Sequence, residues 1–145
     1  MKKIIFILAI VLSFSTTYAN DSRIAPVVLE SFKTSFKDAT EVNWTVSDKY
    51  YKAQFFLNDQ FVAAYYDMDG QMIALTRNIN SSLLPIALQV SIKNNYSDCW
   101  ITDLFEITNE QGTYYYATVE NGETKTVLKS GFNSTWNVYK KTSKK

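Results

Sequence analysis

Apolar residues recur with two different spacings along this chain, and the spacings separate helices from strands. Across residues 26–36 and 84–96 they return every three to four positions, which predicts two amphipathic helices. Each predicted helix has a proline in its first turn, where a missing N–H breaks no hydrogen bond, and Ser81 or Ser82 is a candidate N-terminal cap for the second. Each helix therefore has one apolar face that must cover another element.

Strands are predicted between turn residues where the helical spacing ends, most clearly at 42–46, where apolar and polar residues alternate. Asn58-Asp59, Asp69-Gly70 and Asn121-Gly122 are typical of tight hairpin turns. Because short turns connect antiparallel neighbours, the strands are expected to form meanders. The predicted strands are 42–46, 50–57, 61–67 and 72–78 after the first helix, and 100–108, 114–120, 123–129 and 132–140 after the second.

The two halves of the chain resemble each other in residue character. At an offset of 60, Val28 matches Leu88 and Asp38 matches Asp98, and at an offset of 64 the strand that starts at Tyr50 matches 114–119. Such a recurrence predicts one supersecondary unit used twice. The predicted fold is therefore α+β, a tandem repeat of a helix plus a four-stranded antiparallel meander, with the helices on one face of the sheet or sheets.

The predicted repeats are residues 24–79 and 80–140. The pattern leaves open whether the two meanders join into one continuous sheet or pack side by side.

Residues 1–19 have the pattern of a secretory signal peptide. A basic start precedes an apolar run at 4–12, and small residues follow at Thr17 and Ala19. The apolar run is too short to span a bilayer, and the alternative is an uncleaved membrane anchor. Cleavage after Ala19 would leave residues 20–145 as a single domain without a membrane span, in the periplasm or secreted.

Charge and cysteine content narrow the class of protein. The leader contains two lysines and no acid, so the 15 basic and 14 acidic residues of the whole chain become 13 and 14. That balance lacks the basic footprint of a nucleic-acid-binding protein, and no nucleic-acid partner is predicted. Cys99 is the only cysteine, so an intramolecular disulfide is impossible, and we expect Cys99 to be a small buried apolar residue.

The chain contains no histidine, which removes most catalytic machinery. Histidine is the commonest general base near neutral pH, so Ser-His-Asp and Cys-His arrangements cannot be built. Neither a dinucleotide-binding nor a phosphate-binding glycine motif occurs. Catalysis by two carboxylates alone is the one alternative, because glycosidases need only paired acids. The sequence therefore predicts a protein that is not an enzyme.

Asp67 and Asp69 form the one local group of metal-ligating side chains. Oxygen ligands at alternate positions before Gly70 are similar to the start of a calcium loop, but the later ligands of such a loop are absent. An Asp-Gly pair is also what a tight hairpin requires. A simple turn without a cofactor is the prediction, and a calcium ion held by Asp67 and Asp69 is the alternative.

Adjacent tyrosines in strands indicate a candidate partner-binding face. Neighbouring strand residues point to opposite sides, so each pair places one ring on the helix side and one on the open side. In 50–57 the set that begins at Tyr51 is the more apolar and should face the helix. The predicted partner-binding residues on the open face are Tyr50, Lys52, Phe56, Tyr65, Tyr114 and Tyr116. The alternative is that these tyrosines only stabilise the sheet by cross-strand contacts.

Aromatic and turn residues also carry a family resemblance that covers nearly all of residues 20–145. They are Phe36, Asp38, Trp44, Tyr51, Phe55, Tyr65, Tyr66, Asp67, Asp69 and Gly70, with Leu84-Pro85 opening the second unit. The chain resembles the PepSY-like family of small secreted or periplasmic bacterial proteins, also described as β-lactamase-inhibitor-protein-like. The resemblance implies a non-catalytic domain that binds or inhibits another protein, and it carries over no inhibitory residues.

The sequence thus predicts a secreted, non-catalytic binding module, inhibitor-like or regulatory, that presents an aromatic sheet face to a protein or peptide partner. The alternative is a periplasmic sensor or carrier of calcium or another small ligand. A contiguous exposed patch would favour the first function, and a closed apolar cavity would favour the second.

Overall fold

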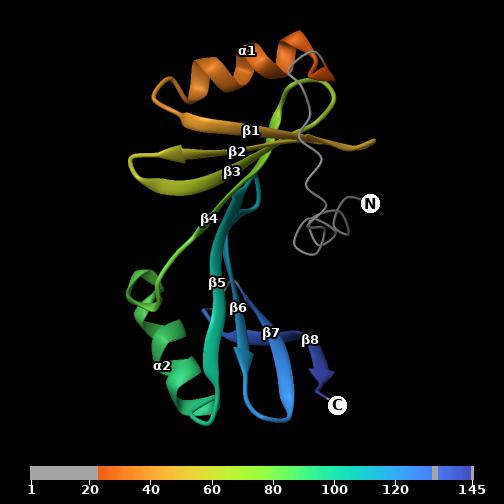
Figure 1. Ribbon diagram of the computed structural model, residues 1–145. Helices are drawn as coiled ribbons and strands as arrows, with labels where there is room; N and C mark the ends of the chain where they lie inside the picture. Colours follow the sequence, from red (N-terminus) through yellow and green to blue (C-terminus); the bar gives the residue numbers. More distant parts are fainter. Residues whose placement is uncertain (1–22, 132–133, 145) are drawn as a thin grey trace.

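The computed structural model describes residues 23–131 and 134–144, and these form one antiparallel sheet of eight strands with two α-helices. The strand order in the sheet is the order in the chain, β1 to β8 (Figure 1). The helices are α1 (Pro26–Ser35) and α2 (Ile86–Asn95), with a 3-10 turn, η3 (Ser81–Leu83), before α2. The strands are β1 (Thr40–Val46), β2 (Tyr51–Leu57), β3 (Gln60–Tyr66), β4 (Met72–Asn78), β5 (Trp100–Asn109), β6 (Gly112–Glu120), β7 (Thr124–Ser130) and β8 (Trp136–Ser143).

The first core lies between α1 and the strands β1 to β3. Phe32 of α1 makes edge-to-face contacts with Trp44 and Phe55, with ring centroids 5.2 and 5.0 Å apart. Tyr51, Ala53 and Phe55 of β2 all face this core, as the alternation in the sequence predicts. Burial of these large rings supplies much of the apolar stabilisation in this half of the molecule.

The second core lies between α2 and the strands β5 to β7. Leu84 and Leu88 pack on Leu104, Ala117 and Leu128. The prediction that Ser81 or Ser82 caps this helix is wrong. Asn80 instead accepts a hydrogen bond from the Ser82 backbone N–H and starts the separate turn η3, and the helix begins after Pro85. Proline disfavours a helical conformation in the residue before it, which explains the interruption at Leu84.

The predicted tandem repeat of a helix plus a four-stranded meander is also wrong. The ladder continues through the middle of the molecule, because β4 pairs directly with β5 from Leu75↔Thr108 to Asn78↔Phe105. Arg77 reinforces that junction with two hydrogen bonds to Glu106, of 2.8 and 3.2 Å. Matching residue types at fixed offsets report local helix and strand signals, and they carry no information about how one set of strands pairs with the other.

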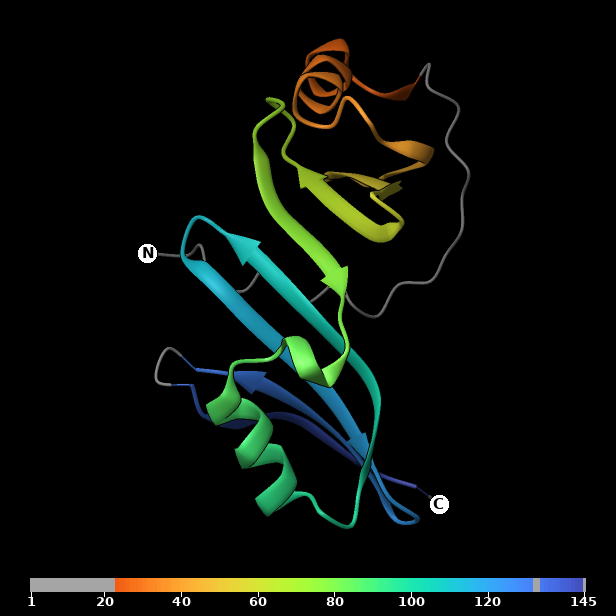
Figure 2. The same ribbon diagram turned by 90° about the vertical axis from the view of Figure 1, so that its left-hand side faces the viewer.

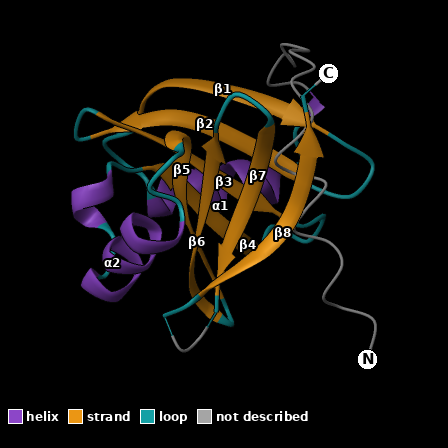
Figure 3. Cartoon of the chain, turned by 90° about the horizontal axis from the view of Figure 1, so that it is seen from below, coloured by secondary structure: helices purple, strands orange, loops and turns teal. Residues whose placement is uncertain are grey.

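The sheet bends along β4, so its two ends do not lie in one plane. Strands β1 to β3 lie beneath α1, and β5 to β8 run in a different direction beside α2 (Figures 1 and 2). Both helices pack on the same face of the sheet, which we call the outer face. Leu75 of β4 packs in the core under α1, and it pairs with Thr108 of β5. Leu104 points to the same side of β5 as Thr108, and it packs under α2. The opposite, inner face has no helix on it (Figure 3).

Two further predictions differ from the structure. The last strand begins at Trp136, whereas the prediction begins it at residue 132, and residues 132–133 lie outside the described part of the chain. Cys99, expected to be buried, is only half-buried.

Among the described residues, no helix is long and apolar enough to cross a membrane. The predicted signal peptide, residues 1–19, lies outside the described residues.

Candidate binding surface

The inner face carries an aromatic cluster assembled from both ends of the sheet. We call it the inner-face cluster, and it consists of Ala63, Tyr65, Ala74, Phe105, Ile107, Tyr114 and Tyr116. Phe105 and Tyr116 stack nearly parallel, with centroids 5.2 Å apart, and Tyr50 meets Tyr65 edge-on at 5.8 Å. The bend at β4 turns the inner side of β3 toward β5 and β6, and the residues of the inner-face cluster pack together between these strands.

Two lysines lie over the rings of this cluster. The ammonium nitrogen of Lys129 is 4.8 Å from the centroid of Tyr114 and 5.5 Å from that of Tyr116, and Lys52 lies 5.7 Å from Tyr65. Cations over aromatic faces at these distances are attracted by the ring quadrupole. Neither lysine forms an ion pair with a carboxylate among the described residues. The inner face therefore presents positive charge without internal neutralisation at these two positions.

Burial changes the acid–base behaviour of this surface. It raises the pKa of Tyr116 to about 12, with a smaller contribution from Tyr114. It also raises the pKa of Tyr65, mainly by desolvation and secondarily through Tyr50. The same desolvation lowers the pKa of Lys52. An anionic group brought close to Lys52 would offset that penalty by stabilising the charged ammonium.

The six predicted partner-binding residues share the inner face but differ in exposure. Tyr65, Tyr114 and Tyr116 are 3%, 8% and 3% exposed, because the inner-face cluster packs on itself. Tyr50 and Lys52 are half-buried, and Phe56 is 37% exposed. The structure thus brings these residues to one surface, with three of them forming its floor.

The exposed rim of the surface contains a phenylalanine pair that the sequence prediction included only in part. Phe56 and Phe61 pair across the β2–β3 hairpin, with centroids 5.6 Å apart, and Phe61 is 42% exposed. Asn58 and Asp59 both have positive φ, of 51° and 63°, as a two-residue type I′ turn requires. That turn alone fixes Phe61 opposite Phe56, so the sequence contained the signal for it.

Asp67 acts as the cap of the β3–β4 turn. Its Oδ1 accepts hydrogen bonds from the backbone N–H groups of Asp69 and Gln71, at 3.0 and 2.8 Å. Gly70 follows with φ of 83°, and a Cβ there would lie 3.0 Å from a methyl carbon of Val27. In the described parts of the chain, no group of three or more acidic, histidine or cysteine side chains could hold a metal. Calcium binding at Asp67 and Asp69 stays the alternative to a simple turn, and a calcium-dependent thermal shift would test it.

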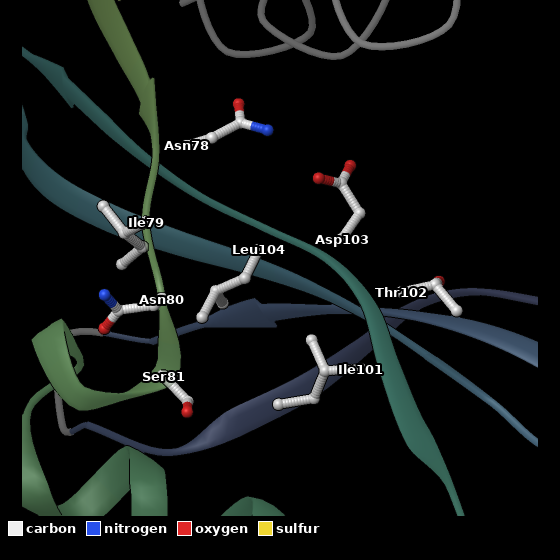
Figure 4. A pocket seen from close by; sticks show the side chains of 8 residues that line it. All are labelled: Asn78, Ile79, Asn80, Ser81, Ile101, Thr102, Asp103 and Leu104. Atoms are coloured by element: carbon white, nitrogen blue, oxygen red, sulfur yellow. The ribbon is translucent and has the colours of Figure 1, made fainter. Parts of the chain in front are cut away.

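A groove of about 370 Å³ opens where β4 leaves β5 (Figure 4). Its sides come from the end of β4 and the turn after it, and from the first residues of β5. In Figure 4, Asn78 and Asp103 extend on the same side of the groove, above Ile101 and Leu104. The groove is open and mixed in polarity, so it differs from the closed apolar cavity expected of a carrier. Its lining residues are Asn78, Ile79, Asn80, Ser81, Ile101, Thr102, Asp103 and Leu104.

The fold has close counterparts among solved structures from Bacteroides. A BLIP-like protein from Bacteroides fragilis has a TM-score of 0.69 and 18% identity, covering 83% of this chain and 86% of that one. A DUF2874 family protein from Bacteroides uniformis has a TM-score of 0.72 and 16% identity, with coverage of 82% and 88%. A protein of proposed periplasmic location from Bacteroides eggerthii has a TM-score of 0.73 and 14% identity, with coverage of 83% and 88%.

At these identities the likeness establishes the fold alone. No protein-family model and no curated protein sequence matches the chain. The BLIP-like part of the sequence resemblance is supported at the level of fold, whereas its PepSY-like part stays a prediction.

Proposed function

We propose that this protein is an exported, non-catalytic binding module that contacts a protein partner through the inner face of its sheet, in an inhibitor-like or regulatory role. The observation that carries the proposal is an aromatic face without a covering helix. Its floor is the inner-face cluster, its rim holds the exposed rings of Phe56 and Phe61, and Lys52 and Lys129 lack carboxylate partners among the described residues. Aromatic side chains are enriched at protein-binding surfaces, and unpaired charges beside them favour a partner of opposite charge.

The fold neighbours support the same class of function. One of them is described as BLIP-like and another as of proposed periplasmic location, and none of the three reported above is described as an enzyme. Together with the leader-like residues 1–19, this favours a periplasmic or secreted location for the mature chain.

The test compares two double variants of the mature protein. Phe56→Ala with Phe61→Ala removes the rim rings, while Ile86→Ala with Val90→Ala removes exposed apolar side chains from the outer side of α2 as a matched control. A photo-crosslinking residue at Gln54, an inner-face neighbour of Phe56, would identify the partner in periplasmic extract of the source organism. Affinities of the purified partner would then be measured.

The rim variant should bind the partner about 10- to 100-fold more weakly, because buried aromatic anchors dominate interface energies. The control should bind as the parent does, and both should retain the parent's circular dichroism spectrum. Tyr116 is unsuitable for truncation because it is only 3% exposed and its loss would disrupt packing. Unchanged binding by the rim variant, with weaker binding by the α2 variant, would place the interface on the outer face and refute the proposal.

A further inference from the structure

The strand β8 leaves one edge of the sheet open. Within the described part of the chain it pairs with β7 on one side only, and residues 137–144 are exposed. Val138 and Tyr139 are among the exposed large apolar side chains of the described chain. An open edge presents unpaired backbone N–H and C=O groups, which can accept another extended chain.

The hydrogen-bonding phase shows which backbone groups point outward. The Lys144 N–H donates to the Glu123 carbonyl at 2.7 Å, which marks a hydrogen-bonded position between β7 and β8. Such positions alternate in an antiparallel ladder, and the register Thr124↔Ser143 to Val127↔Lys140 is continuous. The backbone groups of Lys141 and Ser143 therefore point away from β7, and those of Lys140 and Thr142 point toward it.

Positive charge lies on both sides of this edge. Lys140 pairs with Val127, which packs against the inner-face cluster, and Lys141 pairs with Thr126, so the two ammonium groups emerge on opposite faces. Neither forms an ion pair with a described residue, whereas Lys144 is held by Glu120 at 2.7 Å. No acidic residue follows Glu123 in the sequence. A strand added here would meet a cation on either face.

The charge also decides which occupant fits. Two copies of β8 paired edge to edge would bring four lysines together, and like charges facing across strands are destabilising. A second copy would otherwise have to pair through its other free edge, β1. That strand is irregular, with a register shift between Thr40 and Asn43 and positive φ at Glu41. Such bulges blunt an edge against pairing. An acidic extended segment from a different protein brings neither like charges nor an irregular edge to β8.

We propose that the β8 edge binds an extended acidic peptide segment of another protein, which joins the sheet as a ninth strand beside Lys140 to Ser143. Main-chain hydrogen bonds to Lys141 and Ser143 supply the pairing. Carboxylates of adjacent peptide residues point to opposite faces, so one contacts Lys140 on the inner side and the next contacts Lys141 on the outer side. This edge is separate from the rim formed by Phe56 and Phe61, so the proposal does not depend on the function assigned to the inner face.

The probe is a blocked eight-residue peptide in which two adjacent glutamates alternate with two adjacent valines, so that carboxylates point to both faces of the added strand. Binding to the mature protein is followed by fluorescence anisotropy, and backbone amide hydrogen exchange is followed by NMR. The peptide should slow exchange at Lys141 and Ser143, whose N–H groups point outward, and leave Lys140 and Thr142 nearly unchanged. The same peptide with its valines replaced by prolines keeps the charge but cannot form the ladder, and it should not slow exchange.

The matched variants separate this site from general attraction to a basic protein. Lys140→Glu with Lys141→Glu should weaken peptide binding about tenfold or more, since two charge contacts become repulsive. Lys33→Glu on α1 with Lys37→Glu in the turn after it makes the same change in net charge and should leave the affinity within about twofold of the parent.

Three results would overturn the proposal. The first is equal binding by the two charge-reversed variants. The second is binding without slowed exchange at Lys141 and Ser143, which would show an ionic association without strand pairing. The third is absence of binding to the acidic peptide at low salt, which would leave the lysines only the role of protecting the edge from self-association.

Discussion

Tyr66 is fully buried beneath Trp44, and its hydroxyl is the only buried side-chain polar atom among the described residues that has no hydrogen-bond partner. A buried hydroxyl without a partner loses its hydration and gains nothing in return. Tyr66→Phe should therefore raise the free energy of unfolding by about 1 kcal/mol at neutral pH. Urea denaturation would measure the change, with Tyr139→Phe on the exposed edge as the control. A variant less stable than the parent would contradict this account of the hydroxyl.

The same residue has a consequence at high pH. Burial raises the pKa of Tyr66 from 10.0 to about 12. Below pH 10 the phenol is protonated in both the folded and the unfolded chain. Between pH 10 and 12 the unfolded chain releases the proton first, so stability falls as the pH rises. Tyr66→Phe should show a shallower fall over that window than the parent.

At the scale of elements, Glu120 fixes the end of β8 to the rest of the sheet. Its carboxylate accepts from Lys144 at 2.7 Å, from Lys125 at 3.1 Å and from the hydroxyl of Thr102 at 2.9 Å. Lys144 also lies 5.3 Å from the ring centroid of Trp100, so one lysine links β8 to β6 and to the start of β5. The free edge is thus anchored at its end, while Lys140 and Lys141 are left to solvent.

This anchor should make the protein sensitive to acid. Hydrogen bonding from Lys144, then from Lys125 and Thr102, lowers the pKa of Glu120 from 4.5 to about 2. The unfolded chain binds the proton first as the pH falls, so the contribution of Glu120 is present above pH 4.5 and is lost toward pH 2. Glu120→Gln should lose less stability than the parent over that window. Equal losses in urea denaturation at a series of pH values would show that the carboxylate plays no such role.

At the scale of the whole molecule, the inner-face cluster joins the two ends of the sheet into one cooperative structure. Ile107 of β5 is almost completely buried in this cluster, together with Ala63 and Tyr65 of β3. Ile107→Val should destabilise the protein by about 1 kcal/mol, and unfolding should remain a single transition. Amide exchange in α1 would report the end with β1, and amide exchange in α2 would report the other. Separate midpoints for the two ends would contradict this view.

Local patterns in the sequence predict which side of a strand faces the helix, but they do not predict what covers the opposite side. The alternation in β2 correctly places Tyr51, Ala53 and Phe55 under α1, because side-chain direction follows from strand geometry alone. The burial of Tyr65 and Tyr116 depends on the bend at β4, which brings together strands about 50 residues apart in the chain. No short window of sequence contains that information.

The same limit explains the wrong fold prediction. Similar residue types in two stretches suggested two self-contained units, whereas pairing of β4 with β5 is decided by backbone groups common to every residue. Arg77 and Glu106 meet across this junction although 28 residues separate them in the chain, and neither belongs to a recognisable motif. The strand positions were accessible to sequence analysis, and their assembly was not.

The strands follow one another in the sheet in the same order as in the chain, and this order affects the rate of folding. Each strand pairs with its immediate neighbours in the chain, so no strand waits for a partner that is synthesised much later. Contacts between near neighbours close short loops, and chains rich in such contacts cross their folding barrier quickly for a β-sheet protein. A chain that emerges N-terminus first, from a ribosome or a membrane pore, can extend its sheet one hairpin at a time. The edge strand β8 is then the last to join.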